Sequence, residues 1–117
     1  MTPEEIIQRQ VMAYNARDID AFVGCHHPEV VLYNYTEEAP FAQGRAEVRK
    51  LYGGIFSASP ELHSEVTQRM IMGDKVIDHE IITGRQGVDK MLIIAIYSIE
   101  DGLIRRADFI RGKTAST

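Results

Sequence analysis

The sequence is poor in cysteine. Cys25 is the only cysteine among 117 residues. A single cysteine excludes an internal disulfide and is typical of a protein from a reducing compartment. A basic N-terminal start followed by an apolar stretch is also missing, so we expect no secretory signal and a cytoplasmic location.

Long apolar runs and an excess of basic residues are missing as well. The longest apolar run, residues 91–97, is far shorter than the roughly 20 residues that a membrane span requires. The chain has 13 lysines and arginines against 17 acidic residues, a formal net charge of −4. Nucleic-acid binding depends on a basic face that displaces counterions from phosphates. We therefore expect neither a membrane nor a nucleic acid as a partner.

The composition that remains is that of an ordinary globular protein. Hydrophobic residues make up 44% of the chain and charged residues 26%. A chain of this length has the size of one domain and buries roughly two-thirds of its unfolded surface. We expect residues 1–117 to form a single domain.

Capping and proline signals predict three helices in the first sixty residues. Thr2, Pro3 and Glu5 form a capping box that satisfies backbone amides at the start of the first helix. The residue before a proline avoids the helical region, so the pair 27–28 is expected to end the second helix. The expected helices cover about residues 2–16, 18–27 and 44–56.

Segments rich in branched and aromatic residues predict a sheet after and between these helices. Asp101-Gly102 is a strong signal for a two-residue type I′ hairpin, because glycine tolerates the positive φ that this turn requires. The expected strands cover residues 30–35, 62–72, 75–85, 90–100 and 103–111.

Residues 91–99 are apolar on both faces of their expected strand. Met91, Ile93, Ala95, Tyr97 and Ile99 alternate with Leu92, Ile94 and Ile96. A strand of this kind is covered on both faces, and the expected helices can cover only one. We therefore expect a homodimer that forms through the other face of the sheet.

Four short motifs, in this order along the chain, resemble the nuclear-transport-factor-2-like superfamily in its SnoaL-like and ketosteroid-isomerase-like branch. They are N-A-R-D-I-D-A at 15–21, P-E-V-V at 28–31, G-R-A-E-V-R at 44–49 and D-G-L-I at 101–104. The resemblance implies an α+β, cystatin-like, cone-shaped roll with three N-terminal helices packed on a curved, mostly antiparallel sheet. Because this fold hosts isomerases, hydrolases, dehydratases, cyclases and binding modules, it implies no single reaction.

Steroid isomerases of this superfamily use an aspartate base, with a tyrosine and a protonated aspartate as oxyanion donors. The resemblance puts Asn34 at the base position, Gln10 at the tyrosine position and Ala95 at the second acid. Asn34 cannot accept a proton near neutral pH. A steroid-isomerase mechanism is therefore not expected.

Limonene-epoxide hydrolases, which also resemble this chain, activate water with an Asp-Arg-Asp arrangement. Arg106 and Asp108 have the spacing that puts two side chains on one face of a strand. The partner acid is unidentified, so this activity is the less favoured one.

Strand alternation predicts which polar side chains enter the cavity. The side chains expected there with Asn34 are Ala95, Tyr97, Arg106 and Asp108. From the neighbouring strand, either His79 or the Asp78/Glu80 pair points inward, but not both. His79 would act as general acid or base, oriented by Asp108, because imidazole titrates near neutrality. The alternatives are a satisfied core histidine at 79 and a partly buried ion pair between Arg106 and Asp108.

These observations predict a protein that binds a small, largely apolar organic molecule. The expected catalytic residues are His79, Asp108 and Asn34, and the expected ligand-binding residues are Tyr14, Gln10, Tyr97, Arg106, Ala95 and Phe56. An enzyme of this kind would catalyse isomerisation, dehydration or hydrolysis without a cofactor. The alternative is a non-catalytic ligand-binding or dimerisation module. No metal site is expected, because the adjacent side chains of Cys25, His26 and His27 diverge and structural sites need four ligands.

Overall fold

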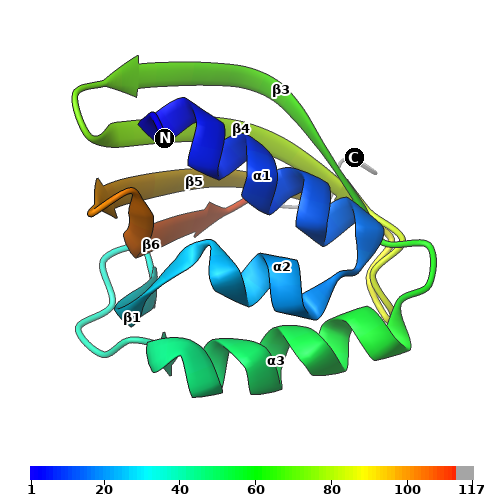
Figure 1. Cartoon of the computed structure of the whole chain (residues 1–117). Helices are drawn as coiled ribbons and strands as arrows, with labels where there is room; N and C mark the ends of the chain where they lie inside the picture. The colour runs from blue at the N-terminus through cyan, green and yellow to red at the C-terminus, as the bar shows by residue number, and fades with distance from the viewer. Residues whose placement is uncertain (113–117) are drawn as a thin grey trace.

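The computed structural model describes residues 1–112 as three helices on one face of a six-stranded sheet (Figure 1). The elements are α1 (Pro3–Ala16), α2 (Ile19–Gly24), β1 (His26–Asn34), β2 (Ala42–Gln43), α3 (Gly44–Ala58), β3 (His63–Met72), β4 (Lys75–Thr83), β5 (Lys90–Glu100) and β6 (Leu103–Arg111). None of the described helices has the length and apolar character that crossing a membrane requires.

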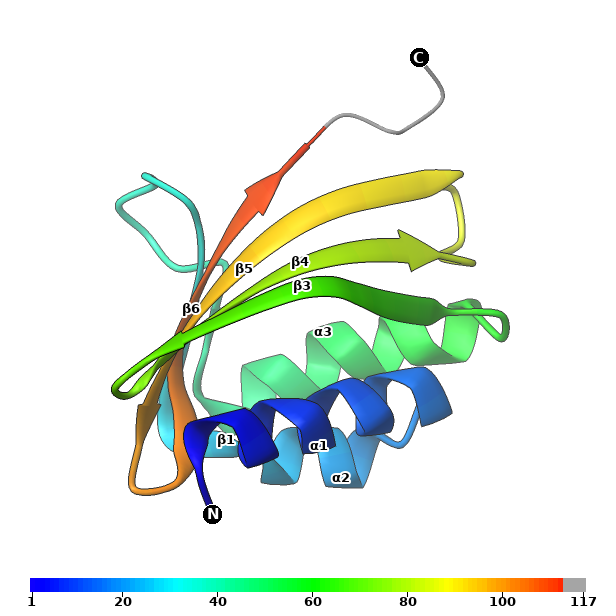
Figure 2. The same cartoon turned by 90° about the horizontal axis from the view of Figure 1, so that it is seen from above.

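The strand order in the sheet is β2-β1-β6-β5-β4-β3. Among the strand pairs of residues 1–112, β1 and β6 are parallel and the other four pairs are antiparallel. Seen from above, the long strands curve over the helices, which all lie on the concave side (Figure 2). The expected α+β architecture, with three helices on a curved, mostly antiparallel sheet, is confirmed.

The local signals at the helix starts act as expected. The Thr2 hydroxyl accepts a hydrogen bond from the Glu5 amide at 3.1 Å, and the Glu5 carboxylate accepts one from the Thr2 amide at 2.8 Å. Asp18 caps α2 by accepting a bond from the Ala21 amide at 3.1 Å. Together these side chains satisfy amides that have no partner inside their helices.

The first strand begins earlier than the sequence predicts. The expected helix end at 27–28 lies inside β1, because His26 already pairs with Ile104 of β6. The register then shifts between His26 and Val31, around Pro28. Proline has no backbone N–H to donate to the hydrogen-bond ladder of a sheet, so it is found where the strand pairing is irregular.

Two turns define the ends of the C-terminal strands. Asp101 and Gly102 have φ values of 55° and 73°, as the predicted type I′ hairpin requires. Gly84 follows β4 with a φ of 76°, and a Cβ there would overlap the backbone carbonyl of Glu61. The hairpin between β4 and β5 therefore packs closely on the segment before β3. In addition, the backbone N–H of Gln86 in this hairpin donates to the hydroxyl of Ser59 in that segment at 3.0 Å.

An aromatic cluster joins the three helices on the concave side of the sheet. The ring centroids of Phe22 and Tyr52 are 4.6 Å apart, and Tyr14 meets Phe56 edge-on at 5.6 Å. Such pairs contribute about 0.5–1.5 kcal/mol beyond their buried area. The cluster fixes the positions of α1 and α3 above the sheet.

The convex face of the sheet carries a group of apolar side chains and has no covering element within residues 1–112. Its half-buried side chains include Ile77, Ile81, Leu92, Ile94, Ile96 and Ile110. The described helices cover only the concave face (Figure 2).

Candidate functional site

A cavity of about 390 Å³ lies between the concave face of the sheet and the helices α1 and α3. Much of its wall is apolar, including Val11, Ile55, Ile82, Ile93 and Phe109. The polar side chains that line it are Gln10, Tyr14, Asn34, Tyr52, Ser64, Glu80, Arg85, Tyr97 and Arg111. A concave space that combines apolar wall with convergent polar groups is typical of a small-molecule site.

Glu80 is the acidic side chain of this cavity, and it is 6% exposed. The Ser64 hydroxyl donates to its Oε1 at 2.7 Å, and the Tyr97 hydroxyl donates to its Oε2 at 3.4 Å. Burial raises the pKa of Glu80 to about 7, and the negative charge of Asp78 adds to this rise. The hydrogen bonds from Ser64 and Tyr97 lower the same pKa. Glu80 can therefore release and accept a proton near neutral pH.

Asp78, one inward position before Glu80, is in a different environment. Its carboxylate is fully buried and accepts two hydrogen bonds from Arg69, at 2.7 Å from Nε and 2.9 Å from Nη2. Arg69 also donates to Gln8 of α1 at 3.1 Å. The two acids therefore differ in environment, because Asp78 is paired with a guanidinium, while Glu80 faces the cavity and has no cationic hydrogen-bond partner within residues 1–112.

The tyrosines of the cavity remain neutral donors. Burial is the largest cause that raises the pKa of Tyr97 and Tyr14 well above the ordinary value, and it raises that of Tyr52 to about 12. A neutral phenol can donate a hydrogen bond to an oxygen that gains negative charge.

Gln10 brings an unsatisfied polar group to the same cavity. Its Oε1 is buried and has no hydrogen-bond partner among the described residues. A buried acceptor without a partner costs stability, so such atoms are few in native proteins.

Asn15 holds the strand edge that carries Ser64. Its Oδ1 accepts from the Ser64 amide at 2.7 Å, and its Nδ2 donates to the Ser64 carbonyl at 3.1 Å. The side chain thus substitutes for a neighbouring strand and connects α1 to β3. This contact fixes the backbone of the residue that hydrogen-bonds Glu80.

Two arginines lie at the exposed side of the cavity. Arg111, at the end of β6, donates from Nε to Asn34 Oδ1 at 3.0 Å, and its Cζ lies 5.4 Å from the ring centroid of Phe109. Arg85, on the hairpin after β4, has its Nη1 3.9 Å from the sulfur of Met91. We call Arg85 and Arg111 the rim arginines.

Four of the expected site residues line the cavity, and the others do not. Gln10, Tyr14, Asn34 and Tyr97 contribute to its wall. Ala95 is buried on the concave face, and Phe56 belongs to the aromatic cluster between the helices; neither lines the cavity.

The expected position of His79 needs correction. Asp78 and Glu80 point to the concave side, so His79 lies on the convex face, where its ring hydrogen-bonds the Thr67 hydroxyl. Of the two alternatives that strand alternation left open, the Asp78/Glu80 pair points inward, and Glu80 rather than His79 lines the cavity.

Asp108 and Arg106 also lie on the convex face. They form a two-bond ion pair with each other at 2.9 and 3.0 Å, and Arg106 stacks over the Tyr33 ring at 4.2 Å. The reason is the register of the parallel ladder, which sets Asn34 opposite Phe109 rather than Asp108. Phe109 and Arg111 consequently share the cavity with Asn34.

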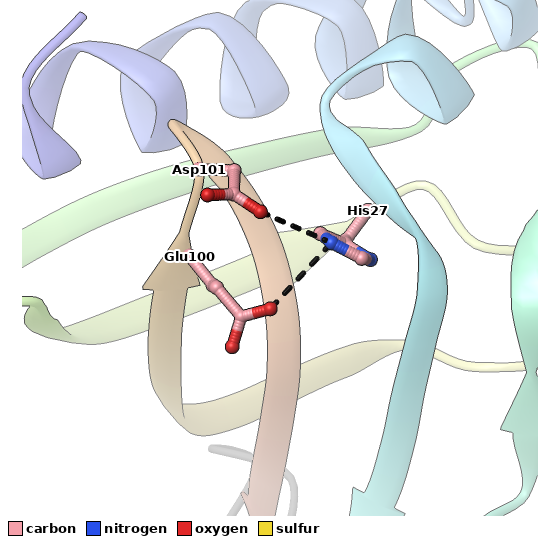
Figure 3. Close-up of side chains that lie close together, drawn as sticks. All are labelled: His27, Glu100 and Asp101. Atoms are coloured by element: carbon pink, nitrogen blue, oxygen red, sulfur yellow. Dashed lines mark ion pairs between the residues drawn. The ribbon is translucent and has the colours of Figure 1, made fainter.

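A separate cluster outside the cavity lining is formed by His27 near the start of β1 and by Glu100 and Asp101 at the turn between β5 and β6 (Figure 3). The His27 Nε2 is 3.6 Å from a carboxylate oxygen of each acid. Nδ1 accepts a hydrogen bond from the Glu29 amide at 3.0 Å, so the ring proton is on Nε2 and points at the acids. A metal-binding nitrogen carries no proton, so these contacts fit an electrostatic cluster better than a metal site.

The fold and this cavity together define a cystatin-like protein of the nuclear-transport-factor-2 type. The family model of the SnoaL-like domain matches residues 7–107, and the chain belongs to this family. No curated protein sequence matches the chain.

Solved structures share the fold over nearly the whole chain. An uncharacterized cystatin-fold protein from Novosphingobium aromaticivorans is 26% identical, with a TM-score of 0.87 over 95% of this chain and 99% of that one. A candidate polyketide cyclase from Sinorhizobium meliloti is 22% identical, with a TM-score of 0.76 over 90% and 93% of the two chains. A candidate ketosteroid isomerase from Kribbella flavida is 15% identical, with a TM-score of 0.81 over 98% and 81%.

Proposed function

We propose that the protein binds a small, largely apolar organic molecule in the cavity and that Glu80 transfers a proton on it. The observation that carries this proposal is a carboxyl group with a pKa of about 7, buried in an apolar cavity of about 390 Å³. Perturbed acids in a cavity are frequent at sites of acid–base chemistry.

The proposed step needs only groups of this chain and the substrate. The Glu80 carboxylate takes the proton from a carbon next to a substrate carbonyl, and the electron pair moves onto the carbonyl oxygen. Tyr14 and Tyr52, which line the cavity as neutral phenols, supply hydrogen-bond donors for that oxygen. The protonated Glu80 then returns the proton to another carbon in an isomerisation, or to a leaving hydroxyl in a dehydration. Neither step requires a cofactor.

Deuterium exchange tests this step without knowledge of the natural substrate. The protein is incubated in D₂O with apolar ketones such as 2-tetralone, and loss of the proton next to the carbonyl is followed by NMR. We expect Glu80→Gln to lower the exchange rate by about 10²-fold or more. His79→Ala is the matched control, because His79 lies on the same strand but faces away from the cavity; it should keep the rate.

The same assay separates catalysis from binding alone. Ketones that raise the melting temperature but show no protein-dependent exchange would support the alternative, a non-catalytic ligand-binding module. An unchanged exchange rate in the Glu80→Gln protein would overturn the proposed role of this carboxyl.

We also propose that two copies associate through the convex face of the sheet. Six half-buried isoleucine and leucine side chains on this face support the proposal, since a contiguous apolar surface favours association. The face is separate from the cavity, so association would leave the ligand site accessible.

A cytoplasmic location remains part of the proposal. Cys25 is buried and free, and burial raises the pKa of its thiol. A protonated, buried thiol is poorly reactive, in keeping with a structural role in a reducing compartment.

A further inference from the structure

The rim arginines have only neutral partners within residues 1–112. Arg111 hydrogen-bonds the Asn34 amide oxygen through Nε, and Arg85 approaches only the Met91 sulfur. By contrast, Arg69 and Arg106 each pair with a carboxylate at 2.9 Å or less. The sequence has 17 acidic residues against 13 basic ones, so acids for such pairing are plentiful elsewhere in the chain.

Both rim charges act on the interior of one cavity. Arg85 lines it from the hairpin after β4 and Arg111 from the end of β6, and each lowers the pKa of Tyr14 and Tyr52 against the larger effect of burial. Glu80 lines the same cavity and carries the opposite charge when ionised. The cavity is therefore polarised, with cationic groups at the rim and an acid within.

This polarity orients a ligand. A negative group near Glu80 would be repelled, whereas near Arg85 or Arg111 it would meet the N–H groups of a guanidinium. Phe41 and Phe109, whose ring centroids are 5.9 Å apart, lie beneath Arg111 and offer aromatic surface to a flat ring system. The rest of the wall is suited to an apolar body.

We propose that the substrate is an aromatic carboxylate, held with its carboxylate between Arg85 and Arg111 and its neutral, reactive end toward Glu80. This inference rests on the proposed function and specifies its substrate class. Guanidinium groups recognise carboxylates through paired, charge-assisted hydrogen bonds, which a neutral group cannot replace.

A matched pair of probes tests the inference. Binding of 2-naphthoate and of its uncharged analogue 2-naphthamide is measured by isothermal titration calorimetry. The proteins are the full wild-type chain, Arg85→Met, Arg111→Met, the double variant and Arg49→Met. Methionine keeps an unbranched apolar stem, and Arg49 pairs with Asp20 outside the cavity lining, so Arg49→Met is the control. We expect wild type and the control to bind 2-naphthoate at least about tenfold more tightly than 2-naphthamide, and the double variant to lose this preference.

The outcomes separate this inference from the function on which it rests. Equal binding of both probes by wild type, or a preference kept in the double variant, would overturn the carboxylate assignment and leave the apolar-ligand proposal standing. If neither 2-naphthoate nor 2-naphthamide binds to the wild-type protein, the result would contradict the carboxylate assignment and the apolar-ligand proposal alike. If thermal melts show that Arg111→Met is unfolded, Arg85→Met alone must lower the preference for the acid.

Discussion

Ser64 on β3 and Glu80 on β4 are joined by a 2.7 Å hydrogen bond inside the cavity, with the serine hydroxyl as donor. The other carboxyl oxygen accepts a longer bond of 3.4 Å from Tyr97. Glu80 therefore has donors on both oxygens, yet burial still keeps its pKa well above the ordinary value. The balance between burial and these two donors sets the pH at which the proposed acid–base group changes charge.

Replacing Glu80 with glutamine should change how stability depends on pH. The pKa of Glu80 is about 7 in the folded protein against an ordinary value of 4.5. Between these values the folded state keeps a proton that the unfolded chain has released, so this group's stabilising contribution falls as pH rises through the window and levels off above it. Relative to wild type, Glu80→Gln should therefore gain about 3 kcal/mol of stability as the pH rises from 4.5 to 7. Urea unfolding at a series of pH values measures the difference, with Glu65→Gln on the exposed side of β3 as control. Parallel curves for Glu80→Gln and wild type would show that the group is not perturbed.

Removing the Ser64 hydroxyl should raise the pKa of Glu80 further. The hydrogen bond stabilises the charged carboxylate, so Ser64→Ala should shift the pKa upward by about one unit. Tyr97→Phe should shift it in the same direction but less, because its bond is longer. The pH dependence of deuterium exchange, or a carbon-13 NMR titration of the carboxyl, measures the shift. A lower pKa in Ser64→Ala would contradict the assigned direction of the bond.

Loss of the ion pair between Asp78 and Arg69 should lower the free energy of unfolding more than it affects the proposed proton transfer by Glu80. Arg69→Met leaves a fully buried carboxylate without its guanidinium and should cost about 3–5 kcal/mol in the free energy of unfolding. Adding Asp78→Asn should recover part of this loss, because the neutral amide is cheaper to bury than a charge. Urea unfolding of the single and double variants measures both effects. A double variant less stable than Arg69→Met would argue against an uncompensated charge as the cause.

The proposed dimer should depend on the centre of the convex face. Ile94 of β5 lies between β4 and β6 on that face, so Ile94→Glu would place an unpaired charge in the interface. We expect wild type to sediment as a dimer at micromolar concentration and Ile94→Glu to sediment as a monomer. Met12→Glu is the matched control, since Met12 is 63% exposed on α1 and is not part of the convex face. A monomeric wild type would refute the dimer.

Local signals in the sequence predict the elements well, because the interactions that decide them span few residues. The Thr2–Glu5 capping box and the Asp101-Gly102 turn both form as expected. The strands Lys90–Glu100 and Leu103–Arg111 have the bounds that the pattern predicts.

The site depends instead on pairing between distant segments. The parallel contact of β1 with β6 includes a register shift around Pro28, and this shift sets Asn34 beside Phe109. No local pattern specifies such a shift, so the residues opposite Asn34 could not be assigned from sequence.

Alternation along β4 is ambiguous for a different reason. Ile77 and Ile81 flank His79 on one face, while Val76 and Ile82 flank the two acids on the other. Both faces look suitable for burial, and the buried acids are accommodated only because Arg69 and Ser64 come from the neighbouring strand. The presence of Ser64 and Arg69 on the neighbouring strand, as partners for Glu80 and Asp78, is the sequence feature that could have indicated an inward Glu80.

Gly84 has no side chain, and this affects Arg85, the proposed carboxylate ligand, differently from Glu80, the proposed acid–base group. Its backbone approaches the Glu61 carbonyl so closely that any larger residue would push the hairpin outward. Arg85 is the next residue and would move with it, whereas Glu80, anchored within β4 by Ser64 and Tyr97, would stay in place. The proposed recognition of charge and the proposed proton transfer therefore depend on different parts of the backbone, and a substitution at Gly84 would alter the first and leave the second in place.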